Sequence, residues 1–497
     1  MTTLRAPSAR TVDALPVVAG YDLLGERFVE PRDPTALPNP YLVAFNAGVA
    51  ELIGLDPAQA ANPRFLELAS GNARFAGVRS YAAVYAGHQF GVYVPQLGDG
   101  RAITLGEVIA PDGERWEWQL KGAGMTAYSR FADGRAVLRS TVREYLCSEA
   151  MHALGIPTTR ALAIAGSDQL VYRERPETAA VLSRIAPSHV RFGTFEFFHH
   201  RDQLAELKTL ADYVIERFYP QFLQAGDERF GLLLREVVLR TARLIARWQT
   251  VGFQHGVLNT DNMSILGLTL DYGPYGFMEA YDPAWICNHS DPYGRYRFEM
   301  QPTIGLWNCR ALAVALSSLV EKDAALEALA AYEPAYIDHL QALLHAKFGL
   351  AQNAPDDVEL FTQCFRALLD ARVDYTTFFR RLAEVSREAT EEDDRIAELF
   401  ADRAPWEAWL ERYRGRLERE AGDDLARRRR MLAVNPKYVL RNYLAQNAIE
   451  AAERRDFGEI ARLAAVLRRP FDEQPERDAY GSLPPDWAAG LEVSCSS

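Results

Sequence analysis

The spacing of hydrophobic residues changes near residue 200 of the chain. Before it, segments that alternate between apolar and polar positions, or are rich in β-formers, predict strands at Ala102–Val108, Trp116–Leu120, Ala161–Ile164, Leu170–Arg173 and Ala179–Ile185. Gly-Asp-Gly, Pro-Asp-Gly and Gly-Ser-Asp sequences separate several of them and favour turns. Leu138–Leu154 has apolar residues at helical spacing, and Gly155 and Pro157 predict its end. We therefore expect a small α+β unit here.

Helical periodicity dominates after residue 200. It predicts helices at Leu204–Phe222, Leu232–Val251, Leu306–Val320, Ala324–Lys347, Val358–Val385 and within Pro436–Leu467. The segment His255–Pro283 interrupts this pattern, because it has little helical periodicity and many Gly, Asn and Asp residues. Residues 1–80 combine proline-rich turns with short helical patterns such as Tyr41–Leu55.

These changes divide the chain into four predicted regions. Residues 1–80 are an N-terminal extension, and residues 81–198 are a strand-containing lobe. Residues 199–420 are a mainly helical lobe that includes the irregular loop 255–273, and residues 421–497 are a helical segment with a polar tail. A chain of 497 residues exceeds what one core usually spans, so we expect subdomains around a cleft.

Composition excludes several classes of protein. With 48% hydrophobic and 25% charged residues, the chain has enough apolar material for a large core. Its net charge of −12 argues against binding along nucleic acid or an anionic membrane, and no apolar run approaches the ~20 residues of a membrane span. Residues 1–20 lack the continuous apolar core of a secretory signal. The five cysteines are scattered, which predicts no zinc site and suits a reducing, cytoplasmic location.

The irregular loop combines residue types that suit a hard cation. His255-Gly256-Val257-Leu258-Asn259-Thr260-Asp261-Asn262 is followed nine residues later by Asp271-Tyr272-Gly273. Mg²⁺ takes few oxygen ligands from protein and completes its shell with phosphate oxygens and water. Asn and Asp in loops are also common turn and cap formers, which is the competing interpretation of this segment.

Other residues, taken in chain order, favour phosphoryl-transfer chemistry. Lys121 ends an alternating strand, and Glu144 lies 23 residues later on the predicted helix, as in the Lys–Glu pair of kinases. Gly98-Asp99-Gly100 precedes them where a glycine turn would cover phosphates, although it is also a common hairpin turn. Together with the Asn and Asp-Tyr-Gly of the loop, this order predicts a two-lobed, protein-kinase-like α+β fold.

One position departs from the kinase pattern. Val257 occupies the place of the catalytic aspartate and cannot accept a proton, so either the chain is inactive or the carboxylate has moved. Asp261, directly before Asn262, is the nearest replacement. Arg184 and Arg191 add cations suited to phosphate, although each alone is also typical of a surface ion pair.

Several long motifs resemble the selenoprotein O family over essentially the whole chain. They are Tyr85-Ala86-Gly87-His88-Gln89-Phe90-Gly91, Gln96-Leu97-Gly98-Asp99-Gly100-Arg101, Gln119-Leu120-Lys121-Gly122-Ala123-Gly124, His255–Ser264 and Ser494-Cys495-Ser496-Ser497. The resemblance implies a protein-kinase-like fold that binds ATP in a flipped orientation and transfers AMP to Ser, Thr or Tyr hydroxyls of proteins.

The resemblance also implies a role for individual residues. Asp261 would act as the base, and Asn262 and Asp271 would bind Mg²⁺ or Mn²⁺. The nucleotide contacts would come from Gly98, Gly100, Arg101, Lys121, Asp133, Gly134, Arg184, Arg191 and Asp271, with Glu144 positioning Lys121. Some family members have selenocysteine at the position of Cys495, and by this resemblance Cys287 is its candidate disulfide partner.

Three functions remain open at this point. The leading one is transfer of AMP from ATP, with UMP transfer from UTP as a variant. An ordinary kinase that transfers the γ-phosphoryl group is second. A non-catalytic, ATP-binding pseudokinase is third, favoured by Val257 and opposed by the intact pair Asn262 and Asp271.

Overall fold

The computed structural model describes residues 9–494, and its framework is one large antiparallel sheet. In the described residues, nine strands form it in the order β2-β4-β7-β8-β11-β10-β3, with β1 paired to β7 and β9 to β11. Their bounds are β1 Val17–Val18, β2 Val29–Pro31, β3 Tyr41–Phe45, β4 Tyr81–Ala83, β7 Ala102–Ile109, β8 Arg115–Lys121, β9 Ala136–Val137, β10 Arg160–Tyr172 and β11 Pro176–Ala186. Two pairs of short antiparallel strands are separate from it, the hairpin β5 Gly87–Gln89 with β6 Val92–Val94, and β12 Phe253–Gln254 with β13 Gly276–Phe277.

Most of the predicted strands are confirmed, with one difference in the long hairpin. The strands expected at 161–164 and 170–173 are parts of a single strand, β10. Its pairing with β11 shifts register between Gly166 and Leu170, so the Gly-Ser-Asp sequence forms an irregularity within the strand. Such a bulge accommodates residues that would otherwise make a turn.

The alternation of β8 separates an apolar face of the sheet from a polar one. Trp118 and Leu120 are fully buried in a cluster with α1 (Ala47–Leu52) and α2 (Pro63–Ala69). Successive side chains of a strand point to opposite faces, so Gln119 and Lys121 lie on the other side, where the helix α3 (Leu138–Ala153) also packs. β8 thus places Lys121 on the polar face of the sheet, where its side chain is buried.

The helical pattern predicted for Tyr41–Leu55 is wrong in its first half. Tyr41–Phe45 is the strand β3, which pairs with β10 at the sheet edge. Asn46 then caps α1, because its side chain accepts a hydrogen bond from the Val49 N–H and donates to the Ala161 carbonyl. Pairing with β10 therefore overrides the helical pattern of this segment.

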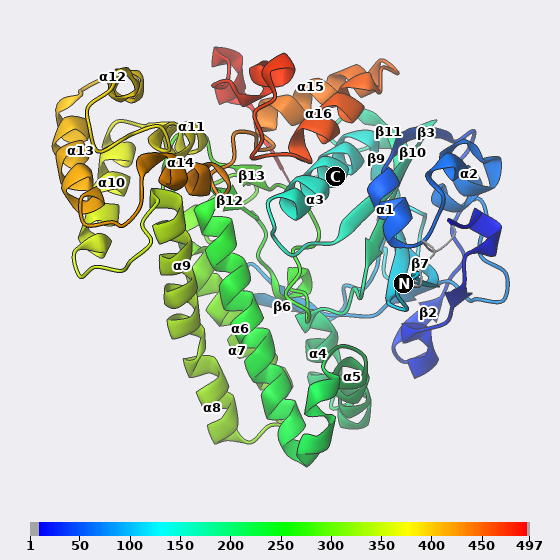
Figure 1. Ribbon diagram of the computed structural model, residues 1–497. Coiled ribbons are helices and arrows are strands. Elements are labelled where there is room, and N and C mark those ends of the chain that lie inside the picture. Colours follow the sequence, from blue (N-terminus) through cyan, green and yellow to red (C-terminus); the bar gives the residue numbers. More distant parts are fainter. Residues whose placement is uncertain (1–8, 495–497) are drawn as a thin grey trace, which may run out of the picture.

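Helix α3 is the central helix of the strand-rich part. It is buried along most of its length and packs on β10 and β11, while α15 (Asn442–Glu453) and α16 (Gly458–Leu467) pack on its other side. Figure 1 shows these two helices, near the C-terminus, lying beside α3. The C-terminal segment therefore covers a helix more than 280 residues earlier in the chain. The sheet and the C-terminal helices together hold α3 in place.

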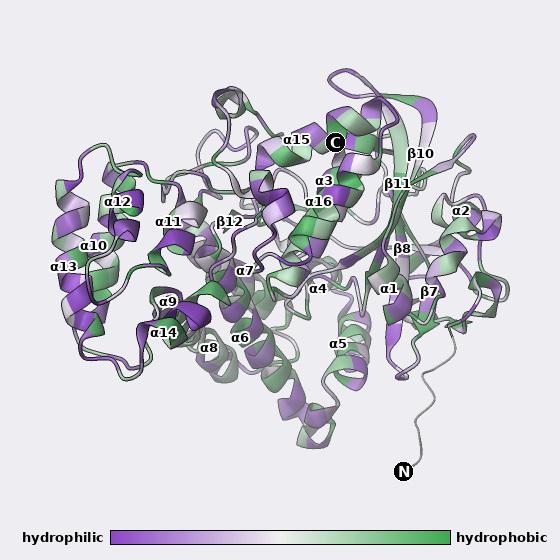
Figure 2. Ribbon diagram, turned by 45° about the horizontal axis from the view of Figure 1, so that its top comes forward, coloured by the Kyte–Doolittle hydropathy of each residue, from purple (hydrophilic) through white to green (hydrophobic). Residues whose placement is uncertain are grey.

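The remaining α-helices lie between residues 192 and 432. Their bounds are α4 Phe192–His199, α5 Leu204–Phe218, α6 Arg229–Thr250, α7 Gln301–Ala315, α8 Lys322–Ala330, α9 Tyr332–Phe348, α10 Asp357–Asp370, α11 Tyr375–Leu382, α12 Glu391–Ala397, α13 Ala404–Leu417 and α14 Asp424–Leu432. Bands of hydrophobic and hydrophilic residues alternate along α6 in Figure 2, as expected for a helix with one face in the core. The single helices predicted at 324–347 and 358–385 are each broken into two.

A mixed α/β architecture is confirmed, whereas the likeness to a two-lobed kinase and the four region boundaries stay predictions. Among residues 9–494, none of the helices combines the length and apolarity of a bilayer span. Cys147, Cys309 and Cys364 are buried in the core. Cys495 lies outside the described residues, so its pairing with the buried Cys287 also stays a prediction.

We predict that Leu146→Ala destabilises the protein. Leu146 is 1% exposed on α3, so its truncation leaves a cavity beneath the sheet and should cost about 2–5 kcal/mol of unfolding free energy. Urea denaturation followed by circular dichroism measures the loss. Leu326→Ala on α8, where the side chain is 55% exposed, is the matched control and should change stability by less than about 0.5 kcal/mol. Equal stability of the two variants would contradict the packing described for α3.

Candidate active site

A cavity of about 670 Å³ lies between the polar face of the sheet and the loop that follows α6. The size suits a nucleotide-sized ligand. Three carboxylates line it, from Asp99, Asp261 and Asp271. Its described lining also contains more cations than carboxylates, namely Arg101, Lys121, Arg130, Arg135, Arg173, Arg184 and Arg191. This excess of positive charge favours an anionic ligand.

Lys121, Glu144 and Arg184 form a buried ion-pair network. The Lys121 Nζ lies 2.6 Å from Glu144 Oε2, and Arg184 Nε donates to Glu144 Oε1 at 2.5 Å. Arg184 Nη1 also donates to the Gln119 side chain at 3.2 Å, across the paired strands β11 and β8. Glu144 is not part of the cavity lining and lies behind the two cations. It therefore fixes them from behind and leaves the cavity side to a ligand.

Asp271 is held by two arginines in a left-handed backbone conformation. Its φ is +59°, a region that non-glycine residues rarely adopt. Arg184 Nη2 donates to Oδ1 at 2.6 Å, and Arg191 Nη1 donates to Oδ2. Burial raises the pKa of Asp271, but the charges of Arg191 and Arg184 outweigh it and hold that pKa well below its usual range. Asp271 is therefore ionised and tied to both arginines.

Burial shifts the pKa values of the other network residues in opposite directions, up for the carboxylate and down for the lysine. Burial raises the pKa of Glu144, but Arg184 and Lys121 together hold it below the ordinary value. Burial lowers the pKa of Lys121 to about 8 despite the attraction of Glu144. Three cations, with Arg191, thus face two carboxylates in this network, so the network has a net positive charge near neutral pH.

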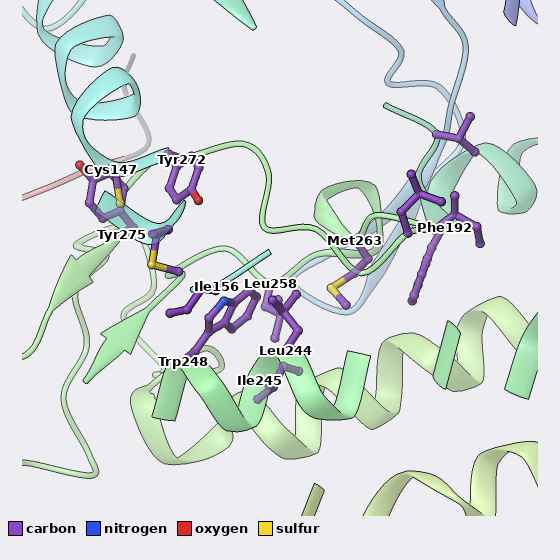
Figure 3. Packing of buried hydrophobic residues seen from close by; sticks show 14 of the residues in the cluster. Cys147, Ile156, Phe192, Leu244, Ile245, Trp248, Leu258, Met263, Tyr272 and Tyr275 are labelled. Carbon is purple, nitrogen blue, oxygen red and sulfur yellow. The ribbon is translucent and has the colours of Figure 1, made fainter. Parts of the chain in front are cut away.

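The loop between His255 and Met263 is anchored to the hydrophobic core by its buried side chains. The fully buried His255 stacks on Trp248 of α6 at 5.6 Å between ring centroids, and its Nε2 lies 2.9 Å from the Leu270 carbonyl oxygen. Leu258 and Met263 flank the polar residues and point into the same core. Figure 3 shows Leu258 near Trp248 of α6 and Met263 near Phe192. Apolar anchors on both sides thus hold a polar turn, Thr260–Asn262, at the cavity.

Asp261 is oriented by contacts from two other elements. Arg191 Nη1 donates to its main-chain oxygen at 2.7 Å, and Gln89 Nε2 donates to Oδ2 at 3.1 Å. The Oδ1 atom is buried and accepts no hydrogen bond from the described residues. Burial raises the pKa of Asp261 to about 7. A carboxylate with one oxygen held and the other unpartnered suits proton transfer or ligand binding in the cavity.

Asn262 and Asp271 are chemically suited to hold a divalent cation. Asn262 Nδ2 donates to the Val257 carbonyl at 2.8 Å, so its side-chain oxygen is the atom that could coordinate a metal. Both residues line the cavity, and amide and carboxylate oxygens are hard ligands that Mg²⁺ uses together with phosphate. Among the described residues, no cluster of three or more His, Cys, Asp or Glu suited to a metal is present. These two donors fit a cation whose other ligands come from the phosphates of a nucleotide and from water.

The predicted glycine turn closes one side of the cavity. Gly98 has φ +73°, and a Cβ there would lie 2.3 Å from the Tyr128 ring; a Cβ at Gly100 would lie 2.9 Å from the Tyr128 carbonyl oxygen. Asp99, between them, accepts hydrogen bonds from the Ala83 N–H at 3.0 Å and from the Gln119 side chain. Its carboxylate is therefore committed to the sheet. Glycines permit the close packing of this turn on the 126–130 segment.

Asp133 is placed behind the cavity wall. It forms a two-pronged ion pair with Arg173, at 2.8 Å and 2.9 Å, and Arg173 itself lines the cavity. Gly134 lines the cavity at φ +70°, where a Cβ would meet the Gly124 backbone. Arg101 also lines it, and burial followed by the charge of Arg184 lowers its pKa. The other sequence-predicted residues thus meet at one cavity, with Asp133 and Glu144 supporting it from outside.

Sequence reasoning assigned no role to several lining residues. Gln89 and Tyr85 belong to a motif that was noted without a function, and Tyr85 lies under the Arg191 guanidinium at 4.6 Å. Arg130, Arg135 and Arg173 lie in segments without a recognisable spacing. Only the clustering of glycines and arginines in 122–135 could have pointed to a site there.

Comparison with known sequences identifies the family of this chain. Residues 14–468 match the family described as protein adenylyltransferase SelO. The relatives include proteins named protein nucleotidyltransferase YdiU from Thioalkalivibrio sulfidiphilus, 54% identical over 98% of this chain and 99% of its relative, and from Herminiimonas arsenicoxydans, 56% identical over 93% of each. A third, from Thiobacillus denitrificans, has the same name and is 52% identical over 98% of this chain and all of its relative. The chain therefore belongs to the SelO family.

Proposed function

We propose that this protein is a nucleotidyltransferase that moves AMP from ATP to Ser, Thr or Tyr hydroxyls of protein substrates. The observation that carries the proposal is the cation network of Lys121, Arg184 and Arg191, next to the unpartnered Oδ1 of Asp261. Membership of the SelO family and the names of the relatives support nucleotidyl transfer in general. The network and Asp261 together suggest which end of the nucleotide reacts.

The distribution of charge supports a flipped orientation of ATP. Lys121 and Arg184 are fixed by Glu144 at the buried end of the network, and a triphosphate has its highest charge at its terminal phosphate. We therefore place the β- and γ-phosphates at these cations, in the flipped orientation. Arg191 contacts both Asp271 and the main-chain oxygen of Asp261, so it joins this phosphate site to the reacting centre. The α-phosphorus then lies toward Asp261.

The remaining nucleotide contacts come from the turns around the cavity. Gly98 and Gly100 line the cavity in a turn that packs on Tyr128, and we place the nucleotide against this turn, while Arg101 adds positive charge. Asp133 holds Arg173, and Gly134 shapes the wall beside it. Mg²⁺ or Mn²⁺, held by Asn262 and Asp271, would supply positive charge to the phosphate oxygens during transfer.

The proton and the leaving group balance in a single displacement. The acceptor hydroxyl oxygen forms a bond to the α-phosphorus, and the bond from that phosphorus to the bridging oxygen of the β-phosphate breaks. Pyrophosphate leaves toward Lys121 and Arg184, which offset its charge. Asp261, which lines the cavity, accepts the hydroxyl proton at its carboxylate, which Gln89 orients. Val257, which lines the cavity, contributes no proton acceptor.

Two finer features belong to the same proposal. The Lys121–Glu144 pair between a strand and a helix, followed along the chain by Asn262 and Asp271, has the order of a protein kinase, and we propose a kinase-like fold on that basis. UTP is an alternative donor, because the phosphate contacts are the same for both nucleotides. Pairing of Cys287 with Cys495 would tie the tail to the segment beyond Asp271.

An isotope experiment separates nucleotidyl transfer from kinase activity. We expect protein acceptors to be labelled from α-labelled ATP and not from γ-labelled ATP. Label from γ-labelled ATP alone would establish the kinase alternative, and no labelling under any metal condition would favour the pseudokinase. Autoradiography of a substrate mixture after incubation with each nucleotide and Mg²⁺ or Mn²⁺ gives the answer.

We predict that Asp271→Asn abolishes the transfer. The amide loses the charge that binds both arginines and the metal, so the rate should fall by about 10²-fold or more. Asp338→Asn on the exposed face of α9 is the matched control and should keep the parent rate. An Asp271→Asn variant as active as this control would refute the role of Asp271.

Nucleotide affinity should weaken as pH rises above about 8. Burial lowers the pKa of Lys121 to about 8, so its cation is present below that pH and is lost above it. The dissociation constant for a non-hydrolysable ATP analogue should therefore increase by up to about tenfold per pH unit between pH 8 and 9. Lys121→Arg should remove most of this dependence, because guanidinium stays charged. Calorimetric titrations of both proteins test this, and identical pH dependence in both would contradict it.

A further inference from the structure

Side chains from two other elements meet at the buried carboxylate of Glu196. Glu196 lies on α4 and is completely buried. The Thr260 hydroxyl, in the turn that contains Asp261, donates to Oε2 at 2.6 Å. The ring Nδ1 of His88, on β5, lies 2.7 Å from Oε1. Both carboxylate oxygens are therefore used, one by the loop and one by the hairpin.

The Thr260 hydroxyl closes the cluster. It accepts a hydrogen bond from the His88 main-chain N–H at 2.6 Å while donating to Glu196. Thr260 is also completely buried. A buried carboxylate or hydroxyl without partners costs free energy, so the three groups stabilise one arrangement of loop, hairpin and helix.

The hairpin that contains His88 also contacts Asp261. Gln89, the next residue, donates to Asp261 Oδ2 at 3.1 Å, and the Phe90 N–H donates to Asn259 Oδ1 at 3.2 Å. The backbones approach so closely that a Cβ at Gly87 would lie 2.9 Å from the Asp261 side chain. The three successive residues His88 to Phe90 thus hydrogen-bond to the loop at Thr260, Asp261 and Asn259.

Helix α4 is seated against the same loop at its first turn. The Phe192 N–H donates to the Met263 carbonyl at 2.9 Å, and these two side chains lie close together in Figure 3. A Cβ at Gly193 would lie 3.3 Å from the Asp261 Cα. The carboxylate of Glu196 is therefore on an element whose position relative to Asp261 is already fixed.

We propose that Glu196 is a positioning residue for the transfer reaction. Through Thr260 and His88 it holds the loop and the β5 hairpin in register, so that Gln89 engages Oδ2 of Asp261 and the residue stays at the cavity wall. This inference rests on the proposed function. Glu196 does not line the cavity and acts through the loop that contains Asp261. We therefore expect its loss to slow proton transfer from the acceptor hydroxyl and to leave the phosphate contacts of Lys121 and Arg184 unchanged.

The test uses two substitutions of Thr260, one that removes the hydroxyl and one that keeps it. Thr260→Val keeps the shape and removes the hydrogen bonds, whereas Thr260→Ser keeps the hydroxyl. We expect Thr260→Val to lower kcat about 10- to 100-fold, as for a small misplacement of a reacting group. The dissociation constant for a non-hydrolysable ATP analogue should change by less than about twofold, and Thr260→Ser should recover most of kcat.

Glu196→Gln and a distant control complete the set. The amide of Gln offers one acceptor where the carboxylate offers two, so Glu196→Gln should behave like Thr260→Val. Thr362→Val, on the exposed side of α10, should match the parent. Parent-like kcat in Thr260→Val, failure of Thr260→Ser to recover it, or a matching loss of analogue affinity would each overturn the inference.

Hydrogen–deuterium exchange separates this inference from the proposed function. Peptides that cover residues 255–263 should exchange faster in Thr260→Val and Glu196→Gln than in the parent, Thr260→Ser and Thr362→Val. Equal exchange in all five proteins would overturn the positioning role. A parent protein without nucleotidyl transfer would refute the proposed function, while the exchange data would still decide whether Glu196 holds the loop.

Discussion

The paired burial of cations and carboxylates around Glu144 and Asp271 is the constraint on which the rest of the site depends. Removing charges from water is costly unless each has a partner in good geometry. Glu144 holds Lys121 and Arg184, and Asp271 holds Arg184 and Arg191, so every cation of the network has a carboxylate within 2.6 Å or less. The network still has more positive than negative charge, and a polyphosphate is the kind of ligand that completes it.

This pairing of charges explains which element of the fold supplies each residue of the site. The sheet supplies Lys121 and Arg184 from its polar face, α3 supplies Glu144, and the loop beyond α6 supplies Asp271. Helices α15 and α16 pack on α3 from the far end of the chain, so the position of Glu144 depends on residues that never reach the cavity. The same principle applies at Glu196, where one buried carboxylate joins a helix, a hairpin and a turn.

Local patterns predicted the parts of this structure that local chemistry decides. The alternation around Trp118 placed Lys121 on the polar face of β8, and the helical spacing of 138–154 placed Glu144 on α3. Tyr41–Phe45 was mistaken for helix because its pairing partner, β10, lies more than 110 residues away. Gln89, Glu196 and Arg173 were missed for the same reason, since their roles come from contacts across 40 to 172 residues that no spacing encodes. Gly98-Asp99-Gly100 does line the cavity, but the carboxylate of Asp99 is turned to Ala83 and Gln119.

The orientation of the nucleotide is the central claim, and a structure with a non-hydrolysable ATP analogue and Mg²⁺ tests it most directly. We predict that the β- and γ-phosphates contact Lys121, Arg184 and Arg191, and that the α-phosphorus lies nearest Asp261. Adenine bound at the buried end of the cavity, with the γ-phosphorus beside Asp261, would contradict it.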